Sequence, residues 1–470
     1  MKIRRSGTLL CREVALYLLV LGPISANAQL LGPEFQVNSF TTLAQHRPAV
    51  AVDASGNFVV VWADAAQESV LNYGIYGQGF TPAGTLGTEF HVNTFTTGLQ
   101  QNPAVAASGT NNFLVVWESD GQDGQARGVV GRRLSATGLP IGGEFVVNTY
   151  TTGYQTSPAV ATDANGNFVV VWVGAGLADA NGVFGQRFNA TGAALGSEFR
   201  ANAFTTGSQQ AAAVAADGLG NFVVVWASGG QDGNNYGVFG QRFNPAGSPL
   251  GGEFQVNTYT TQQQREPAVA ADAAGNFVVT WISYGQDDGS NWGVFAQRFQ
   301  STGVKAGSEF RVNSYTTSSQ FIPAVAADGL GGFAVLWGGV GPTDSLGVYG
   351  RRFDSAGGAV GSELQVNSYT TSNQEYPALA RSDTGNFVVI WQSFGQDDGS
   401  NWGVFGRRMS ANLFQHGFET NPPFWSATTA NMCAGFCDSL APSGCSCEAF
   451  CAANFDCCLD ACQTCGYCGP

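Results

Sequence analysis

The stretch Gly220-Asn221-Phe222-Val223-Val224-Val225-Trp226 returns in close copies along most of the chain. The copies lie at Asn57–Trp62, Asn112–Trp117, Asn167–Trp172, Asn276–Trp281, Gly332–Trp337 and Asn386–Trp391. Their seven closing tryptophans follow one another at intervals of 54 to 56 residues. A fixed period of this length indicates a solenoid, a propeller or an array, so the repeat decides the fold before any local motif is considered.

One repeat, residues 253–308, contains four strand-like segments. Glu253–Asn257 alternates apolar and polar residues, as a half-exposed strand does. Pro267–Asp272 carries small apolar side chains, Phe277–Trp281 is a continuous apolar run typical of a strand covered on both faces, and Gly293–Phe299 follows a polar loop. Four strands per repeat match the blade of a β-propeller, so the sequence predicts an all-β fold.

The small-residue strand should lie innermost, where neighbouring blades crowd together, and the Glu-Phe strand outermost. Seven innermost strands are expected, beginning at Pro48, Pro103, Pro158, Ala212, Pro267, Pro323 and Pro377. The chain starts with an outermost-type segment, Glu34–Asn38, and its last repeat stops after Gly403–Met409. Pairing these two segments would close a seven-bladed ring and remove two exposed edges.

Two other architectures fit the period less well. A linear β-solenoid should lack the circular phase, and tandem small sandwiches should show linkers between repeats. For closure, Gly417–Thr420 competes with the amino-terminal strand, but Pro422 and Pro423 follow it, and proline cannot donate to a β-ladder.

The amino end has the features of a secretory signal peptide. Basic residues precede the apolar run Val14–Ile24, and Ala26-Asn27-Ala28 forms a small-residue cleavage site, so the mature chain is predicted to begin at Gln29. The run is shorter than the ~20 residues of a membrane-spanning helix. We therefore expect a secreted or cell-surface protein without a membrane span.

Removing residues 1–28 takes away four basic residues and one acidic residue, which moves the formal charge from −14 to −17. Such an acidic surface argues against nucleic acid as a partner. An extracellular protein or a glycan is the expected partner.

The loop after the second strand carries Gln-Asp-Gly in several repeats, with neighbouring serine and asparagine. Its carboxylates are Asp123, Asp232, Asp287, Asp288, Asp397 and Asp398. Carboxylate and amide oxygens are the ligands that calcium prefers, so calcium binding is one hypothesis for these loops. The alternative is an Asp-Gly turn held by its own hydrogen bonds. No other cofactor is expected.

A glutamine precedes every innermost strand, at Gln45, Gln100, Gln155, Gln209, Gln264, Gln320 and Gln374. These side chains could form a polar ring at the mouth of the central channel. Seven equal copies favour a structural role in which they bond buried backbone groups between blades.

Catalytic motifs are scarce. Three histidines are present, and the sequence has no nucleophile elbow, zinc-protease motif or phosphate loop. A glycosidase needs only two well-placed carboxylates, which sequence motifs do not reveal. Trp292 and Trp402, at loop ends, could stack on sugar.

Ten of the eleven cysteines lie near the carboxyl end, in a segment too small to fold on a hydrophobic core alone. They are Cys433, Cys437, Cys445, Cys447, Cys451, Cys457, Cys458, Cys462, Cys465 and Cys468. An exported chain favours disulfides. Zinc is the alternative, but adjacent Cys457 and Cys458 do not fit paired C-x₂-C knuckles.

Two resemblances follow from these motifs. The copies of Gly-Gln-Asp-Gly, Gly-Val-Phe-Gly-Gln-Arg-Phe and Glu-Phe-Gln-Val-Asn over residues 33–409 resemble repeats of large secreted bacterial proteins, some of them adhesin-like or calcium-binding. The cysteine spacing from Cys433 to Cys465 resembles the somatomedin-B domain, a family with four disulfides that commonly serves protein recognition. Cys462 and Cys468 are additional and would form a fifth pair.

The sequence thus predicts a signal peptide over residues 1–28, a seven-bladed propeller over 29–409, a linker over 410–431 and a disulfide-rich, somatomedin-B-like domain over 432–470. The favoured functional hypothesis is a secreted, non-enzymatic binding or adhesion protein. The alternative is a secreted hydrolase acting on polysaccharide or a carbohydrate-binding propeller. The two hypotheses can be distinguished by the place in the fold at which repeat-breaking acidic and aromatic residues gather.

Overall fold

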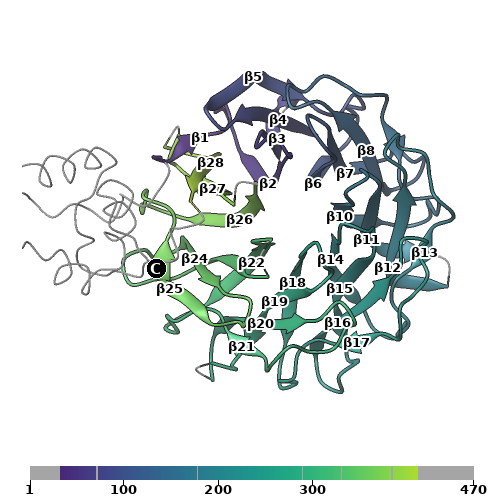
Figure 1. Cartoon of the computed structure of the whole chain (residues 1–470). Coiled ribbons are helices and arrows are strands. Elements are labelled where there is room, and N and C mark those ends of the chain that lie inside the picture. The colour runs from purple at the N-terminus through teal and green to yellow at the C-terminus, as the bar shows by residue number, and fades with distance from the viewer. Residues whose placement is uncertain are drawn as a thin grey trace, which may run out of the picture. The chain divides into compact units, whose positions relative to one another are not determined.

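The computed structural model describes residues 32–410, apart from 70, 71, 177, 288, 330, 383, 384 and 398. Every regular element in this part of the chain is a β-strand, and the strands form seven sheets of four. Figure 1 shows the sheets standing around a common axis. The predicted seven-bladed β-propeller is therefore confirmed. The signal peptide, the linker and the cysteine-rich segment lie outside the described residues.

Each sheet has the predicted order from the axis outward. The innermost strands are β2 (Gln45–Val52), β6 (Gln100–Ala107), β10 (Gln155–Thr162), β14 (Gln209–Ala216), β18 (Gln264–Ala271), β22 (Gln320–Ala327) and β26 (Gln374–Arg381). The second strands are β3 (Phe58–Ser69), β7 (Phe113–Asp120), β11 (Phe168–Gly176), β15 (Phe222–Gly229), β19 (Phe277–Tyr284), β23 (Phe333–Gly339) and β27 (Phe387–Phe394). The third strands are β4 (Asn72–Thr81), β8 (Arg127–Leu134), β12 (Asp179–Phe188), β16 (Tyr236–Phe243), β20 (Trp292–Phe299), β24 (Gly347–Phe353) and β28 (Trp402–Met409). The outermost strands are β5 (Gly84–His91), β9 (Phe145–Val146), β13 (Phe199–Arg200), β17 (Phe254–Gln255), β21 (Phe310–Arg311), β25 (Ala359–Gln365) and β1 (Phe35–Gln36).

The ring closes through its first strand. β1 joins the seventh sheet, where Phe35 pairs with Gly406 and Gln36 with Phe405. Just beyond β1, Val37 donates its backbone N–H to Val404 and is buried in the core between the seventh and first blades. The predicted closure by the amino-terminal segment is confirmed.

The hydrophobic core lies between neighbouring blades. Trp226 packs with Val169 and Val171 of the preceding blade, and Trp62 packs with Val388 and Ile390 across the closure. All seven repeat tryptophans have 0% solvent exposure. A second strand that is covered on both faces explains its uninterrupted apolar sequence.

Two details of the strands differ from the sequence prediction. Five of the seven outermost strands are only two residues long, shorter than the predicted Glu253–Asn257 type of segment. The innermost strands begin at the glutamine, three residues before the predicted start. A β-bulge at the predicted start lets the ladder continue back to the glutamine, as between His46 and Ala49, and it does so even in the fourth blade, where Ala212 replaces the proline.

Candidate functional site

The two faces of the ring carry different loops. Because neighbouring strands are antiparallel, the loops after the second strands and the connections between blades lie at the end where the innermost strands begin. We call this end the bulge face. The other end, the turn face, carries the turns after the innermost strands and those after the third strands.

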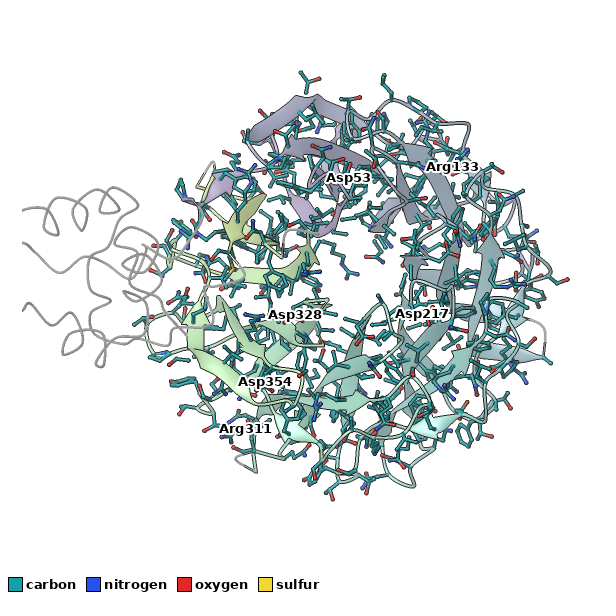
Figure 2. The ribbon with its side chains drawn as sticks, in the orientation of Figure 1. Asp53, Arg133, Asp217, Arg311, Asp328 and Asp354 are labelled. Atoms are coloured by element: carbon teal, nitrogen blue, oxygen red, sulfur yellow. The ribbon has the colours of Figure 1, made fainter. Side chains whose placement is uncertain are left out.

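On the turn face, aspartates organise tight turns. The Asp217 carboxylate accepts hydrogen bonds from the backbone N–H groups of Leu219 and Asn221, each at 2.9 Å, and from the Asn221 side chain at 2.8 Å. Figure 2 labels Asp53, Asp217 and Asp328 in equivalent turns of three blades. These acids follow the repeat and are engaged by their turns or by neighbouring elements, as Asp328 is by Arg352 at 2.8 Å.

Repeated charged residues also fasten each blade to its neighbour. Arg133 donates to the Ala190 carbonyl of the next blade at 2.8 Å, and Arg187 donates to the Pro245 carbonyl at 2.6 Å. On the bulge face, a glutamate at the start of each outermost segment accepts from a backbone N–H of the preceding blade. Those glutamates are Glu34, Glu89, Glu144, Glu198, Glu253, Glu309 and Glu363.

The described loop carboxylates proposed for calcium lie on the bulge face of the second, fourth, fifth and seventh blades, one in each: Asp123, Asp232, Asp287 and Asp397. Asn148 donates to Asp123 at 3.0 Å, and Asn313 and Asn38 donate to Asp287 and Asp397, both at 3.3 Å. Asp288 and Asp398 lie outside the described residues.

Every blade has a carboxylate side chain at this loop position. Asp232 occupies it in the fourth, and Glu68, Asp179 and Asp344 occupy it in the blades whose sequence lacks Gln-Asp-Gly. The glycine at the start of the third strand provides the space for this carboxylate, because a Cβ on Gly128 would lie 2.6 Å from an Asp123 oxygen. Within the described residues, no three His, Cys, Asp or Glu side chains gather into a metal-binding group.

The repeated glutamines lie just behind these carboxylates. All seven have at most 1% solvent exposure. Asn148 donates to Gln155 at 3.2 Å and Asn367 donates to Gln374 at 3.1 Å, while Gln155 and Gln374 donate to backbone carbonyls. The structure therefore connects loop carboxylate, asparagine and glutamine in a buried network between blades, and not in a solvent-exposed ring.

The residues that vary between blades are found at the β-bulges. In each innermost strand one extra residue stands between the two halves of the ladder, as between His46 and Ala49. This residue has φ between +50° and +54° in all seven blades, and none of the seven is glycine or buried. The seven are Arg47, Asn102, Ser157, Ala211, Glu266, Ile322 and Tyr376, which we call the bulge ring.

This backbone conformation is strained for residues with a Cβ. Each such position costs on the order of 1–3 kcal/mol, and strain of this kind concentrates at functional sites. A β-bulge also redirects a side chain, often beside an active site. The bulge ring thus has the two properties expected of a ligand-contacting surface, retained strain and variation between otherwise equal repeats.

A polar network links part of the bulge ring across three blades. Buried Glu118 accepts from the side chain of Asn102, from the backbone N–H of Ser157 at 2.6 Å and from Arg127 at 3.0 Å. Arg127 also contacts Asp120 at 2.6 Å. Asn102 in turn accepts from Arg47, whose guanidinium lies 5.4 Å from the centre of the Tyr376 ring.

Desolvation raises the pKa of three acids of the bulge face. One is the buried Asp64, where hydrogen bonds from Ala66, Gln67 and Gln45 oppose the shift. Desolvation raises the pKa of Glu266 above its ordinary value, although a hydrogen bond from the Ile322 N–H and the charge of Arg265 oppose the shift. Its side chain is nevertheless solvent-exposed, a combination expected within a ring of surrounding strands. Desolvation also raises the pKa of Glu375, opposed by a hydrogen bond from Asn373.

Aromatic side chains also lie on the bulge face. Trp292 meets Tyr284 edge-on at 5.3 Å, and Trp402 meets Phe394 in the same way at 5.3 Å. Both tryptophans open third strands on the bulge face and are half-buried. Tyr236 holds the equivalent place in the fourth blade, where the Arg265 guanidinium stacks over its ring at 4.2 Å.

Cavities are found on both faces of the ring. A shallow depression of about 590 Å³ over the loops of the fourth blade reaches Tyr236 on the bulge face. A cavity of about 250 Å³ lies on the turn face between the fifth and sixth blades, and a smaller one repeats between the third and fourth. Repetition marks the turn-face cavities as features of blade packing, so the bulge face is the better site.

Sequence reasoning missed the bulge ring and Glu118. A signal was present, since the residue before Pro48, Pro103, Pro158, Pro267, Pro323 and Pro377 changes from repeat to repeat. Only the ladder register shows that this residue is an added one in the strand.

Comparison with known proteins gives relatives in structure alone. No family model matches the sequence, and no curated protein matches it. An ulvan lyase of a polysaccharide lyase family, solved with a bound glucuronate–sulfated rhamnose ligand, has a TM-score of 0.50 and 11% identity, covering 80% of this chain and 96% of that one. An α-L-arabinofuranosidase from Fusarium graminearum has a TM-score of 0.47 and 10% identity, covering 83% and 100%. An α-L-arabinanase from Penicillium chrysogenum has a TM-score of 0.45 and 13% identity, covering 80% and 97%.

At such low identity the similarity shows the fold alone. The hypothesis of a non-enzymatic binding or adhesion protein is nevertheless contradicted, because the ulvan lyase, a polysaccharide-degrading enzyme, shares this propeller fold over most of both chains. That similarity favours the alternative of a carbohydrate-acting propeller. The first hypothesis rested on missing local motifs, whereas the acids of the bulge face come from separate blades. The described residues include no helix long and apolar enough to cross a membrane.

Proposed function

We propose that this protein is a carbohydrate-active propeller that binds a polysaccharide on the bulge face, near the axis, and hydrolyses it there. One observation carries the proposal: acids and aromatic residues that break the repeat gather on this face, whereas acids that follow it are engaged in turns and blade contacts. Sugar rings present apolar faces that stack on aromatic side chains, and hydroxyl groups that bond to polar ones.

Glu266 is the candidate general acid. A glycosidase acid must hold its proton near the working pH, and the raised pKa of Glu266 favours the protonated form. The hydrogen bond from the Ile322 N–H at 3.2 Å fixes the orientation of the carboxyl group while leaving it open to solvent. Hydrolysis also requires a second, ionised carboxylate. Glu375 is its candidate by position on the same face alone, since its raised pKa favours the protonated form.

Aromatic residues supply candidate sugar platforms. The Trp402 ring lies 6.4 Å from the ring of His46, the second residue of an innermost strand. Trp292 packs against the core between the fifth and sixth blades, as Phe321 does. Tyr236 borders the depression over the fourth blade. A polysaccharide crossing the face would meet these rings on either side of the axis.

A panel of neutral and acidic polysaccharides tests the proposal, with new reducing ends measured after incubation with the purified protein. We expect hydrolysis of at least one polysaccharide. Glu266→Gln should lower the rate at least ~100-fold while the substrate still binds, because general acid catalysis contributes about 10²–10⁴-fold. Products with an unsaturated uronic acid would contradict hydrolysis, and a panel in which nothing is bound or cleaved would contradict the whole proposal.

We further propose that the chain is exported through its residues 1–28 and that the carboxyl-terminal segment is a somatomedin-B-like domain with five disulfides. The signal-peptide pattern and the cysteine spacing support this. Intact mass of the mature protein, before and after alkylation without reductant, should show no free thiol. Several alkylated cysteines would contradict five disulfides.

A further inference from the structure

The bulge ring keeps side chains where glycine would be the unstrained choice. Glycine occupies positive-φ positions elsewhere in the same blades, for example Gly56 in the first blade with φ of +80°. In all seven innermost strands, however, the bulge residue carries a side chain, including the β-branched Ile322. A side chain kept against this backbone cost motivates a functional hypothesis for the ring.

Arg47 differs from Arg127 and Arg265, two other arginines of the bulge face. Arg127 is paired with Glu118 and Asp120, and Arg265 stacks on Tyr236 beside Glu266. Arg47 is exposed, and no described carboxylate lies within salt-bridge distance of it. Its positive charge is thus available to a ligand.

The neighbours of Arg47 fix its guanidinium without neutralising it. Asn102, the bulge residue of the second blade, accepts a hydrogen bond from Nη1, and Tyr376, the bulge residue of the seventh, lies under the guanidinium. The Arg47 backbone N–H donates to the Gln392 side chain at 2.9 Å. Both oxygens of nearby Glu118 are already engaged, by Asn102 and Ser157 on one and by Gln101 and Arg127 on the other.

An oriented guanidinium with free donors matches the fork geometry of a carboxylate or sulfate group. In a protein of net charge −14, an acidic polysaccharide is repelled overall, so its binding needs such a local positive subsite. The remaining members of the ring suit uncharged parts of a sugar. Asn102 and Ser157 can bond hydroxyl groups, and Tyr376 offers a ring face.

We propose that the bulge ring is the ligand-binding surface of this propeller, and that Arg47 is its subsite for the anionic group, carboxylate or sulfate, of an acidic polysaccharide. This inference rests on the proposed carbohydrate function and names its substrate class.

Calorimetric titration of the full chain with three oligosaccharide classes tests the subsite: oligogalacturonate for carboxylate, a sulfated galactan for sulfate, and arabinan as a neutral glycan. We expect tighter binding of one acidic class than of arabinan, and the class that binds identifies the anionic group. Arg47→Met should weaken that binding about 10- to 100-fold, since a charged hydrogen bond is lost. Arg47→Lys should retain more of the affinity.

Arg311→Met is the matched control. Arg311 is exposed on the outermost strand β21, and Figure 2 shows it at the outer rim of the ring, so its removal should leave binding unchanged. Raising the salt concentration should weaken binding by the wild type more than binding by Arg47→Met.

Unchanged affinity in Arg47→Met, or equal affinity for arabinan and the acidic oligosaccharides, would overturn the subsite and leave the carbohydrate function standing. Absence of binding by every class would overturn both. Circular dichroism melting of each variant separates loss of binding from loss of folding.

Discussion

Two repeat tryptophans that look identical in sequence should respond differently to the same substitution. Trp117 and Trp226 are both fully buried between blades. The Trp117 indole N–H donates to Gln100 at 3.0 Å, whereas Trp226 Nε1 and the oxygen of Gln209, its counterpart glutamine, have no hydrogen-bond partner. Replacing each tryptophan by phenylalanine removes a similar volume but breaks a hydrogen bond only in the second blade.

The difference in stability between the two variants can be calculated from the Trp117–Gln100 hydrogen bond. Removing the tryptophan donor leaves the buried Gln100 oxygen unpaired, which costs about 1–3 kcal/mol. In the fourth blade Trp226→Phe removes a donor that is already unpaired, so only the cavity cost remains. We therefore expect Trp117→Phe to lower the free energy of unfolding by about 2 kcal/mol more than Trp226→Phe does.

Guanidinium unfolding followed by far-ultraviolet circular dichroism measures both variants against the wild type, and unchanged denaturant slopes are needed for the comparison. Trp226→Ala serves as a reference for the cavity term and should cost about 3–5 kcal/mol. Equal losses in the two phenylalanine variants, or a larger loss in Trp226→Phe, would refute the assigned hydrogen bond and the reasoning built on it.

Other predictions follow from the closure, the acids and the loops. Val37→Asp should cost several kcal/mol by burying a charge in the closing core, whereas Gln36→Asp, on the exposed side of the same strand, should cost under about 1 kcal/mol in the same unfolding assay. The folded state raises the pKa of Glu266 above 4.5, so the stability that its protonated form contributes is complete below that pH and is lost as the pH rises through the folded pKa. Over this window the melting temperature of Glu266→Gln should therefore fall less steeply with pH than that of the wild type. Equal slopes for the two proteins would contradict the raised pKa. If the loops of Asp287 and Asp397 bind calcium, excess calcium should raise the melting temperature and a chelator should lower it, while an unchanged midpoint removes the hypothesis.

The fold was predictable because the four-strand pattern of a propeller blade occurs seven times in the sequence. The tryptophan period gave the blade number, the small residues after Pro267 indicated the innermost strand, and the unpaired segment Glu34–Asn38 indicated the closure. Each of these properties depends on side-chain size, spacing or the chemistry of proline, all of which are local in sequence.

The site was less predictable because it depends on register. Sequence showed Glu266 as one acid among many, and only the β-bulge places it in a ring with Arg47 and Tyr376. Likewise, Asp179 and Asp344 reach the same position as Asp123 through loops of different length, so a motif search missed them. Contacts between blades some 55 residues apart carry no local sequence signal.

The most direct test of the central claim is cleavage of the polysaccharide panel by three proteins: the wild type, Glu266→Gln on the bulge face and Val304→Ala at an exposed site on the turn face. Size-exclusion chromatography would follow the chain length of each polysaccharide with time. The account predicts that wild type and Val304→Ala shorten the same polysaccharide at the same rate and that Glu266→Gln is at least ~100-fold slower. Cleavage by Glu266→Gln at the wild-type rate, or no cleavage of any polysaccharide by the wild type, would contradict it.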